Sequence, residues 1–152
     1  MKYDLSFYKA FVFDYDGVIL NSVVYKTRTF LQLFKGYPAQ LEEIDRYIKT
    51  HDVSRFVIFE HIYEHILKIP YNDAAGKGLS SKFGMLLFQD WHKLPLTEGI
   101  KEFLRQESVP KFIASAMPLY ELEKAVSIHG IKKYITKLFG YPVSKIQALE
   151  EV

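Results

Sequence analysis

Residues 11–19 read FVFDYDGVI, an apolar run that ends in two aspartates and a glycine. A short apolar run bounded in this way is typical of a buried β-strand. Asp14 and Asp16 follow the run directly, so they stand at the carboxyl end of the predicted strand. Active sites of open α/β sheets lie at the carboxyl ends of their strands. The stretch therefore predicts a first strand with a functional edge.

The rest of the chain divides into an all-helical stretch and an alternating one. The sequence predicts four helices, from a cap at Asn21 or Ser22 to Lys35 and over 40–49, 55–68 and 79–92. It then predicts a helix over 98–107, a strand over 111–114 and a helix from Pro118 to His129. A strand over 135–139 follows, and a last helix, capped by Ser144, begins at Lys145. Strands that alternate with helices imply a parallel sheet with right-handed crossovers.

The four consecutive helices are too many for a single crossover between the first two strands. We therefore interpret residues 20–94 as an inserted, all-helical cap. Residues 1–19 and 95–152 then form a doubly wound α/β core with a parallel sheet.

The composition excludes several classes of function. The chain has 152 residues and no cysteine, so disulfides, thiolate zinc sites and cysteine nucleophiles are excluded. Lys and Arg number 20 against 18 Asp and Glu, and no basic block is present, so we expect no nucleic-acid partner. No run approaches the ~18 apolar residues of a membrane helix. We expect a cytoplasmic protein that does not bind membranes.

The two aspartates suit catalysis, because carboxylates two residues apart can divide the work of a nucleophile and of a general acid and base. Gly17 allows a sharp turn after them. The alternative is an ordinary turn, in which Asp and Gly are common. A second strand that ends in Ser115 and a later lysine, Lys145, favour the catalytic interpretation.

These segments together resemble the motifs of the haloacid dehalogenase-like (HAD) hydrolase superfamily. Residues 11–19 resemble its first motif, a strand followed by D-x-D-G-[VT]. Residues 111–115 resemble the second motif, a strand that ends in Ser or Thr, and 141–145 resemble the third, which supplies a lysine. The motifs occur in the family's order. Residues 51–56, HDVSRF, resemble the cap helix of the branch that contains phosphoglycolate phosphatases.

The resemblance implies a role for each catalytic candidate. Asp14 would attack a phosphorus atom and form an aspartyl-phosphate, and Asp16 would protonate the leaving oxygen and later activate water. Ser115 and Lys145 would hold the phosphoryl oxygens. Mg²⁺ would bind the Asp14 carboxylate and the backbone carbonyl of Asp16. The second acid also separates phosphoryl transfer from dehalogenation, in which a leaving halide needs no proton.

Substrate binding is assigned by the same resemblance to Gly17, Ala116 and Arg55. A guanidinium on the cap can grip a phosphate or carboxylate with two hydrogen bonds. The alternative for Arg55 is a surface residue in the first turn of its helix.

The function implied is Mg²⁺-dependent hydrolysis of a small phosphorylated metabolite through an aspartyl-phosphate. A phosphomutase of the same fold is one alternative, and a catalytically incomplete binding domain is the other. The family's fourth motif, an acidic pair on a further strand, has no match here. We therefore expect the C-terminal part of the core to be missing and this chain to be inactive or weakly active. We also expect an open edge on the first strand through which the chain self-associates.

One further motif competes with this interpretation. Residues 61–65 read HIYEH and match H-x-x-E-H, the inverted zinc-protease signature. Histidines at i and i+4 share a helix face and can hold a metal ion. No separate third ligand is evident, and the segment belongs to the predicted cap. We therefore interpret His61 and His65 as a polar helix face.

Overall fold

The computed structural model describes residue 5 and residues 7–51, 53–106 and 108–152. The described chain forms two compact units. One consists of the residues up to Asn21 together with Leu94–Val152, and the other is Ser22–Lys93. We refer to them as the α/β unit and the helical unit. The predicted cap, residues 20–94, covers nearly the same span as the helical unit.

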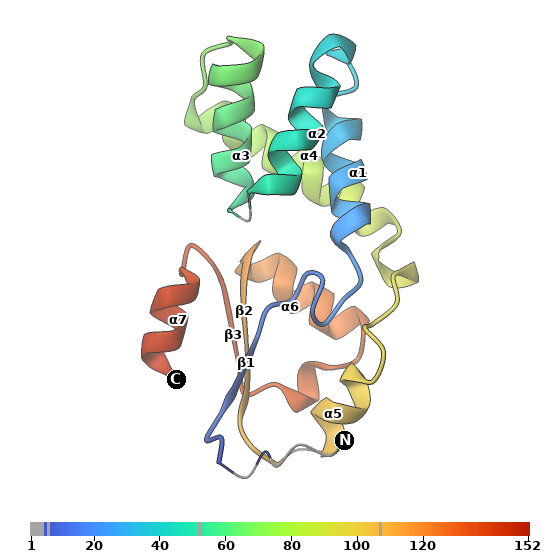
Figure 1. Ribbon diagram of the computed structural model, residues 1–152, viewed down its shortest axis with the longest axis vertical. Helices are drawn as coiled ribbons and strands as arrows, with labels where there is room; N and C mark the ends of the chain where they lie inside the picture. The colour runs from blue at the N-terminus through green and yellow to red at the C-terminus, as the bar shows by residue number, and fades with distance from the viewer. Residues whose placement is uncertain (1–4, 6, 52, 107) are drawn as a thin grey trace. The chain divides into compact units, whose positions relative to one another are not determined.

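The α/β unit is built on a three-stranded parallel sheet, as predicted (Figure 1). The strands stand in the order β1 (Phe11–Phe13), β2 (Lys111–Pro118) and β3 (Lys137–Tyr141). Phe13 lies opposite Ile113 in the β1–β2 register, and Ile113 lies opposite Leu138 on the other side. This register brings the carboxyl ends of β1 and β2 to the same edge of the sheet.

Helices cover both faces of this sheet, as expected of a doubly wound fold (Figure 1). The helices are α5 (Ile100–Gln106), α6 (Leu119–Ile128) and α7 (Lys145–Glu151). On one face, Ala148 of α7 packs in a buried cluster with Ala114 and Phe139. On the other face α6 packs against β2 and β3. The fold class is therefore confirmed.

Two predicted boundaries in this unit are wrong. Pro118 was predicted in the first turn of a helix, but it is the last residue of β2 and the N-cap of α6. β2 thus continues four residues past the predicted 111–114, since its later residues still lie against β3. β3 begins at Lys137 rather than 135, because the 3₁₀ turn Lys132–Tyr134 includes a bond from Ile135 N to Lys132 O. The predicted end of the helix before β2, Glu107, lies outside the described residues.

β1 lies at an edge of the described sheet, so its three residues are only partly buried. The rings of Phe11 and Phe13 pack against the ring of Phe103 in α5, with centroid distances of 5.3 Å for Phe11 and 5.9 Å for Phe13. Both contacts are edge-on, a favourable arrangement for aromatic pairs. Phe103 of α5 thus covers part of the side-chain surface of β1. Self-association through this edge stays a prediction.

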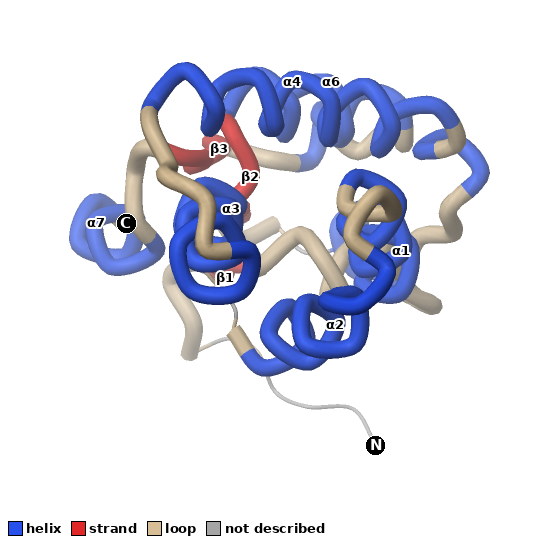
Figure 2. Tube along the Cα trace, turned by 90° about the horizontal axis from the view of Figure 1, so that it is seen from above, coloured by secondary structure: helices blue, strands red, loops and turns tan. Residues whose placement is uncertain are grey.

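The helical unit contains no strand among its described residues (Figure 2). Its elements are α1 (Val23–Leu33), η1 (Pro38–Gln40), α2 (Leu41–Thr50), α3 (Arg55–His61), η2 (Ile62–Leu67), α4 (Asp73–Gln89) and η3 (Trp91–Lys93). Its core is aromatic: the rings of Phe30 and Phe83 lie 4.2 Å apart, and Phe59 packs on both. No helix in the described residues of either unit is both long and apolar enough to cross a membrane.

The third and fourth predicted helices differ in detail from the structure. α3 changes at Ile62 into a π-helix, which ends at Lys68 in the left-handed conformation, with φ 57°. α4 starts at Asp73, six residues before the predicted start at Leu79. The Asn72 side chain accepts a hydrogen bond from Ala75 N at 2.9 Å and so caps this earlier start.

Stacked rings connect α2 to α3 within the helical unit. The rings of Tyr47 and His61 are 3.7 Å apart and parallel within 1°. His51 also stacks on Tyr47, at 4.1 Å, and His65 lies 4.8 Å from His61. His61 is therefore partly buried in a contact between helices, whereas His65 is exposed. The interpretation of both as a polar helix face stays a prediction, to which the structure adds the contact of His61 with Tyr47.

We expect Gly140→Ala to destabilise the α/β unit by about 3 kcal/mol, because a Cβ there overpacks a tight contact. That Cβ would stand 2.6 Å from Leu119 Cα and 2.8 Å from Met117 O, both backbone atoms. Gly78→Ala is the control, since its Cβ meets nothing within 4 Å in the interior of α4. It should stabilise the helical unit by ~0.5–1 kcal/mol. Urea unfolding, followed by circular dichroism, measures the change in stability of both variants. A midpoint of Gly140→Ala equal to that of the wild type would contradict the packing argument.

We expect acidification to destabilise the helical unit through His61. Burial lowers the pKa of His61 from 6.5, and His65, His51 and Lys68 lower it further against an opposing effect of Glu43. The unfolded chain therefore binds this proton more tightly, and the free energy of unfolding falls as the pH drops below 6.5. Thermal unfolding at several pH values measures the loss. His61→Gln should show a shallower loss, and a slope equal to that of the wild type would refute the assignment.

Candidate active site

The centre of the candidate site is an ion pair between Asp14 and Lys145. Asp14 follows the last residue of β1, and its Oδ2 lies 2.7 Å from Lys145 Nζ. The two residues are 131 positions apart in the sequence. Their side chains are 30% and 41% exposed, respectively, so a ligand can reach both. The structure thus brings together the residues that the first and third motifs predict.

Local structure fixes each partner of this pair. Lys145 is the first residue of α7, and Ser144 before it caps that helix, as predicted. The Ser144 side chain accepts from Gln147 N, while the Gln147 side chain accepts from Ser144 N, which together form a capping box. On the other side, Asp14 Oδ1 accepts a hydrogen bond from Tyr15 N at 2.7 Å. One carboxylate oxygen is therefore oriented by the backbone and the other by the ammonium group.

A tight turn carries Asp16 beyond β1. The Tyr15 carbonyl accepts hydrogen bonds from Ile19 N at 3.0 Å and Leu20 N at 2.9 Å, and Gly17 N donates to Leu20 O at 2.7 Å. Gly17 has φ 78°, a left-handed conformation that favours glycine, as the sequence predicts. Asp16 is partly exposed at the start of this turn. We call residues 14–20, which contain the two catalytic candidates Asp14 and Asp16, the catalytic turn.

Ser115 lies on β2, the strand next to β1. Because Phe13 pairs with Ile113, residue 115 lies just beyond the carboxyl end of β1. Ser115 is buried, and its Oγ accepts a hydrogen bond from Met117 N at 3.1 Å. Ala116 is partly exposed next to it. These residues share the sheet edge of Asp14, while their roles toward a substrate stay predictions.

The available donors suit a magnesium ion. Among the described residues, no group of three or more His, Asp or Glu side chains is arranged to hold a metal. Asp14 supplies a carboxylate and Asp16 a backbone carbonyl, both of which are hard oxygen ligands. Mg²⁺ is commonly held by one or two carboxylates together with water and substrate phosphate. The donor set therefore fits Mg²⁺, whereas the H-x-x-E-H segment gathers no third ligand in the described part of the chain.

Arg55 belongs to the helical unit and is buried, with 6% of its surface exposed. Its guanidinium carbon lies 4.7 Å from the centre of the Phe83 ring, a cation–π contact with the aromatic core of that unit. The alternative of a surface arginine is therefore wrong. A role in substrate binding stays a prediction. Asp52, in the segment that carries the cap resemblance, lies outside the described residues.

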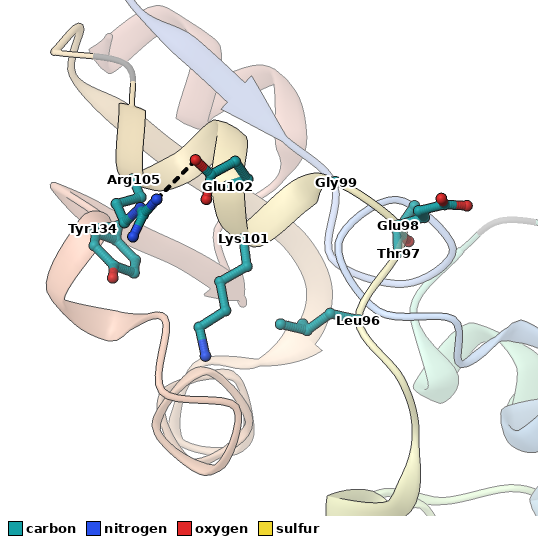
Figure 3. A pocket seen from close by; sticks show the side chains of 8 residues that line it. All are labelled: Leu96, Thr97, Glu98, Gly99, Lys101, Glu102, Arg105 and Tyr134. Carbon is teal, nitrogen blue, oxygen red and sulfur yellow. Dashed lines mark hydrogen bonds and ion pairs between the residues drawn. The ribbon is translucent and has the colours of Figure 1, made fainter.

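A separate pocket of about 500 Å³ opens on the α/β unit (Figure 3). Its lining mixes both charges with apolar and polar groups and consists of Leu96, Thr97, Glu98, Gly99, Lys101, Glu102, Arg105 and Tyr134. Arg105 is already paired with Glu102 at 2.8 Å. None of the catalytic candidates lines this pocket, so it is not the candidate site.

The sequence analysis missed one residue next to the catalytic turn, His129. Its Nδ1 lies 3.3 Å from the Tyr15 hydroxyl, although the two residues are 114 positions apart. His129 follows α6 and stands outside every motif. A single sequence contains no local pattern that could indicate such a contact.

Comparisons with known proteins identify the fold. No protein-family model and no curated protein matches the sequence. Among solved structures, a protein of Lactobacillus plantarum assigned as a phosphoglycolate phosphatase matches with a TM-score of 0.68 and 17% identity, over 94% of this chain and 69% of its own. A protein of Thermotoga maritima assigned as a beta-phosphoglucomutase matches with a TM-score of 0.58 and 16% identity, over 88% and 61%.

A third solved structure is a protein of Bacillus subtilis assigned as a HAD-hydrolase and bound to magnesium. It matches with a TM-score of 0.55 and 17% identity, over 88% of this chain and 65% of its own. The chain thus spans between 61% and 69% of the three structures. Together with the parallel sheet, the inserted helices and the Asp14–Lys145 pair, these likenesses show that the chain has the haloacid dehalogenase-like fold.

Proposed function

We propose that this protein hydrolyses phosphate monoesters with Asp14 as the nucleophile. The observation that carries the proposal is the Asp14–Lys145 pair at the carboxyl end of β1. A partly exposed carboxylate next to an ammonium group can approach a phosphate dianion that it would otherwise repel. The neighbours assigned as phosphatases support the same reaction class.

The first step transfers the phosphoryl group to the protein. A carboxylate oxygen of Asp14 attacks the phosphorus atom in line with the ester oxygen, and the bond from phosphorus to that oxygen breaks. Asp16, protonated at this stage, gives its proton to the leaving oxygen, so the product alcohol departs neutral. The phosphoryl group is then bound to Asp14.

The second step returns both carboxylates to their starting states. The Asp16 carboxylate takes a proton from a water molecule as the water oxygen attacks phosphorus. The bond between phosphorus and Asp14 breaks, and inorganic phosphate leaves. Lys145 offsets the negative charge that the phosphoryl oxygens present in both steps. The Ser115 hydroxyl and the backbone of Ala116 and Gly17 are proposed to contact the same oxygens.

Asp14 and Asp16 are the residues that would hold Mg²⁺. When bound, this ion offsets the charge of the transferring phosphoryl group. The magnesium-bound neighbour supports the assignment. The substrate class is a small phosphorylated metabolite, and Arg55 on the helical unit is the proposed contact to its remote phosphate or carboxylate.

A phosphomutase is the second candidate, because one structural neighbour is assigned as a beta-phosphoglucomutase. Both reactions share the phosphorylated Asp14 and differ in the acceptor, which is water for a phosphatase and a substrate hydroxyl for a mutase. Release of phosphate from a panel of monoesters, measured against isomerisation of a sugar phosphate, distinguishes them. If neither activity exceeds the background of the Asp14→Asn variant, the result favours the binding-domain alternative.

We expect Asp14→Asn to lower turnover of p-nitrophenyl phosphate by at least about a thousandfold while the fold is kept, because an amide is a poor nucleophile. Asp90→Asn is the matched control, since Asp90 is likewise paired with a lysine, Lys93, at 2.6 Å, but in the helical unit. It should leave turnover unchanged. The assay is phosphate release at a protein concentration suited to slow turnover. Retention of more than a few per cent of wild-type activity by Asp14→Asn would exclude Asp14 as the nucleophile.

We also expect removal of divalent cations with EDTA to abolish phosphate release, and addition of Mg²⁺ to restore it. Without the cation the attacking carboxylate and the phosphate repel each other with less compensation, so the loss should be at least about a hundredfold. Calorimetric titration of the protein with Mg²⁺ gives a second readout. Unchanged turnover in EDTA would contradict a metal-dependent mechanism.

A further inference from the structure

His129 connects two segments of the α/β unit that are distant in sequence. Its Nε2 lies 3.2 Å from the Leu94 carbonyl oxygen, and its Nδ1 lies 3.0 Å from the Ala125 carbonyl oxygen and 3.3 Å from the Tyr15 hydroxyl. His129 is half-buried at the end of α6. Both ring nitrogens therefore have polar partners, from the catalytic turn on one side and from Leu94 on the other.

The chemistry of these partners fixes part of the proton arrangement. A carbonyl oxygen can only accept, so a hydrogen bond to Leu94 O requires a proton on Nε2 and one to Ala125 O requires a proton on Nδ1. A neutral ring makes one of these two bonds, and a cationic ring makes both. The Tyr15 hydroxyl can donate or accept, so it bonds to Nδ1 in either case. The bridge from Tyr15 through His129 to Leu94 therefore forms when Nε2 carries a proton, in the neutral or in the cationic ring.

Tyr15 is one of three fully buried residues of the catalytic turn, with Ile19 and Leu20. It is fully buried between the two catalytic candidates Asp14 and Asp16. Its N–H orients the Asp14 carboxylate, and its carbonyl accepts two hydrogen bonds that close the turn. A displacement of Tyr15 would therefore change the direction of both carboxylates.

Leu94 begins the segment by which the chain returns from the helical unit. That segment is bonded to the catalytic turn and its continuation: Asn21 N donates to Pro95 O at 3.1 Å, and Thr97 N donates to Ile19 O at 2.9 Å. Leu20 and Leu96 form an antiparallel bridge between these two bonds. The outgoing and returning chain thus lie side by side, and His129 is bonded to a residue of each.

We propose that His129 is a positioning residue, which holds the catalytic turn through Tyr15 and the returning segment through Leu94. The inference rests on the proposed phosphatase function for its kinetic consequence, but not for its structural one. His129 touches none of the proposed reacting atoms, so its loss should lower kcat by misplacing Asp14 and Asp16. It should leave KM for a small ester nearly unchanged.

Four variants separate the two bonds of the bridge, from Nδ1 to the Tyr15 hydroxyl and from Nε2 to Leu94 O. His129→Leu removes both bonds. His129→Gln keeps an amide donor close to the position of Nε2, and His129→Asn keeps a hydrogen-bonding group close to that of Nδ1. Tyr15→Phe removes only the hydroxyl and keeps the buried ring. His92→Leu is the control, because His92 is an exposed histidine two residues before Leu94.

The first measurement is amide hydrogen exchange, which requires no activity. His129→Leu should speed exchange of the amides of Ile19, Leu20, Asn21 and Thr97 by about three- to tenfold, the effect of one lost hydrogen bond. His129→Gln should keep the protection of Asn21 and Thr97, and Tyr15→Phe should affect mainly Ile19 and Leu20. The amides between β2 and β3 should not change.

The second measurement is turnover of p-nitrophenyl phosphate. His129→Leu should lower kcat by about three- to tenfold, and the double variant with Tyr15→Phe should be no slower than His129→Leu alone. The proposal would be overturned if His129→Leu and Tyr15→Phe both had the amide exchange rates and the kcat of the wild type. Faster exchange with an unchanged kcat would overturn it as well. Faster exchange in a protein whose wild type releases no phosphate would support the structural part of the proposal and count against phosphatase activity in this chain.

Discussion

The site depends on one electrostatic contact, the ion pair between Asp14 and Lys145. As a partly exposed pair it adds little to the free energy of unfolding. In the proposed reaction its value is chemical, since it places a cation next to the carboxylate that would meet a phosphate. For the pair to form, β1 must stand next to β2, and α7 must begin beside the end of β1. The sheet order and the capping box at Ser144 together meet both conditions.

Features that depend on neighbouring residues could be predicted from the sequence. The apolar run 11–13 and the acids after it indicated β1 and its functional end, and Ser144 indicated the start of α7. The resemblance to ordered family motifs then placed Asp14 and Lys145 in one site. Element ends were less predictable, because tertiary contacts decide them: β2 continues to Pro118 along β3, and the Asn72 cap moves the start of α4 to Asp73.

Contacts between distant residues could not be predicted. The burial of Arg55 against Phe83 depends on how α3 packs on α4, and no pattern in either helix specifies it. An arginine stem and guanidinium can pack on an aromatic ring as readily as they bind an anion. The bond between His129 and Tyr15 likewise arises from the path of α6 over the sheet. In both cases the residue type allows several roles and only the tertiary structure selects one.

The spacing of the two aspartates has a physical reason in this fold. Asp14 and Asp16 are partly exposed, while Tyr15 is fully buried. If the second acid directly followed the first, it would enter the core, where an unpaired carboxylate is costly. The two-residue spacing therefore lets one buried side chain anchor two carboxylates that a substrate can reach.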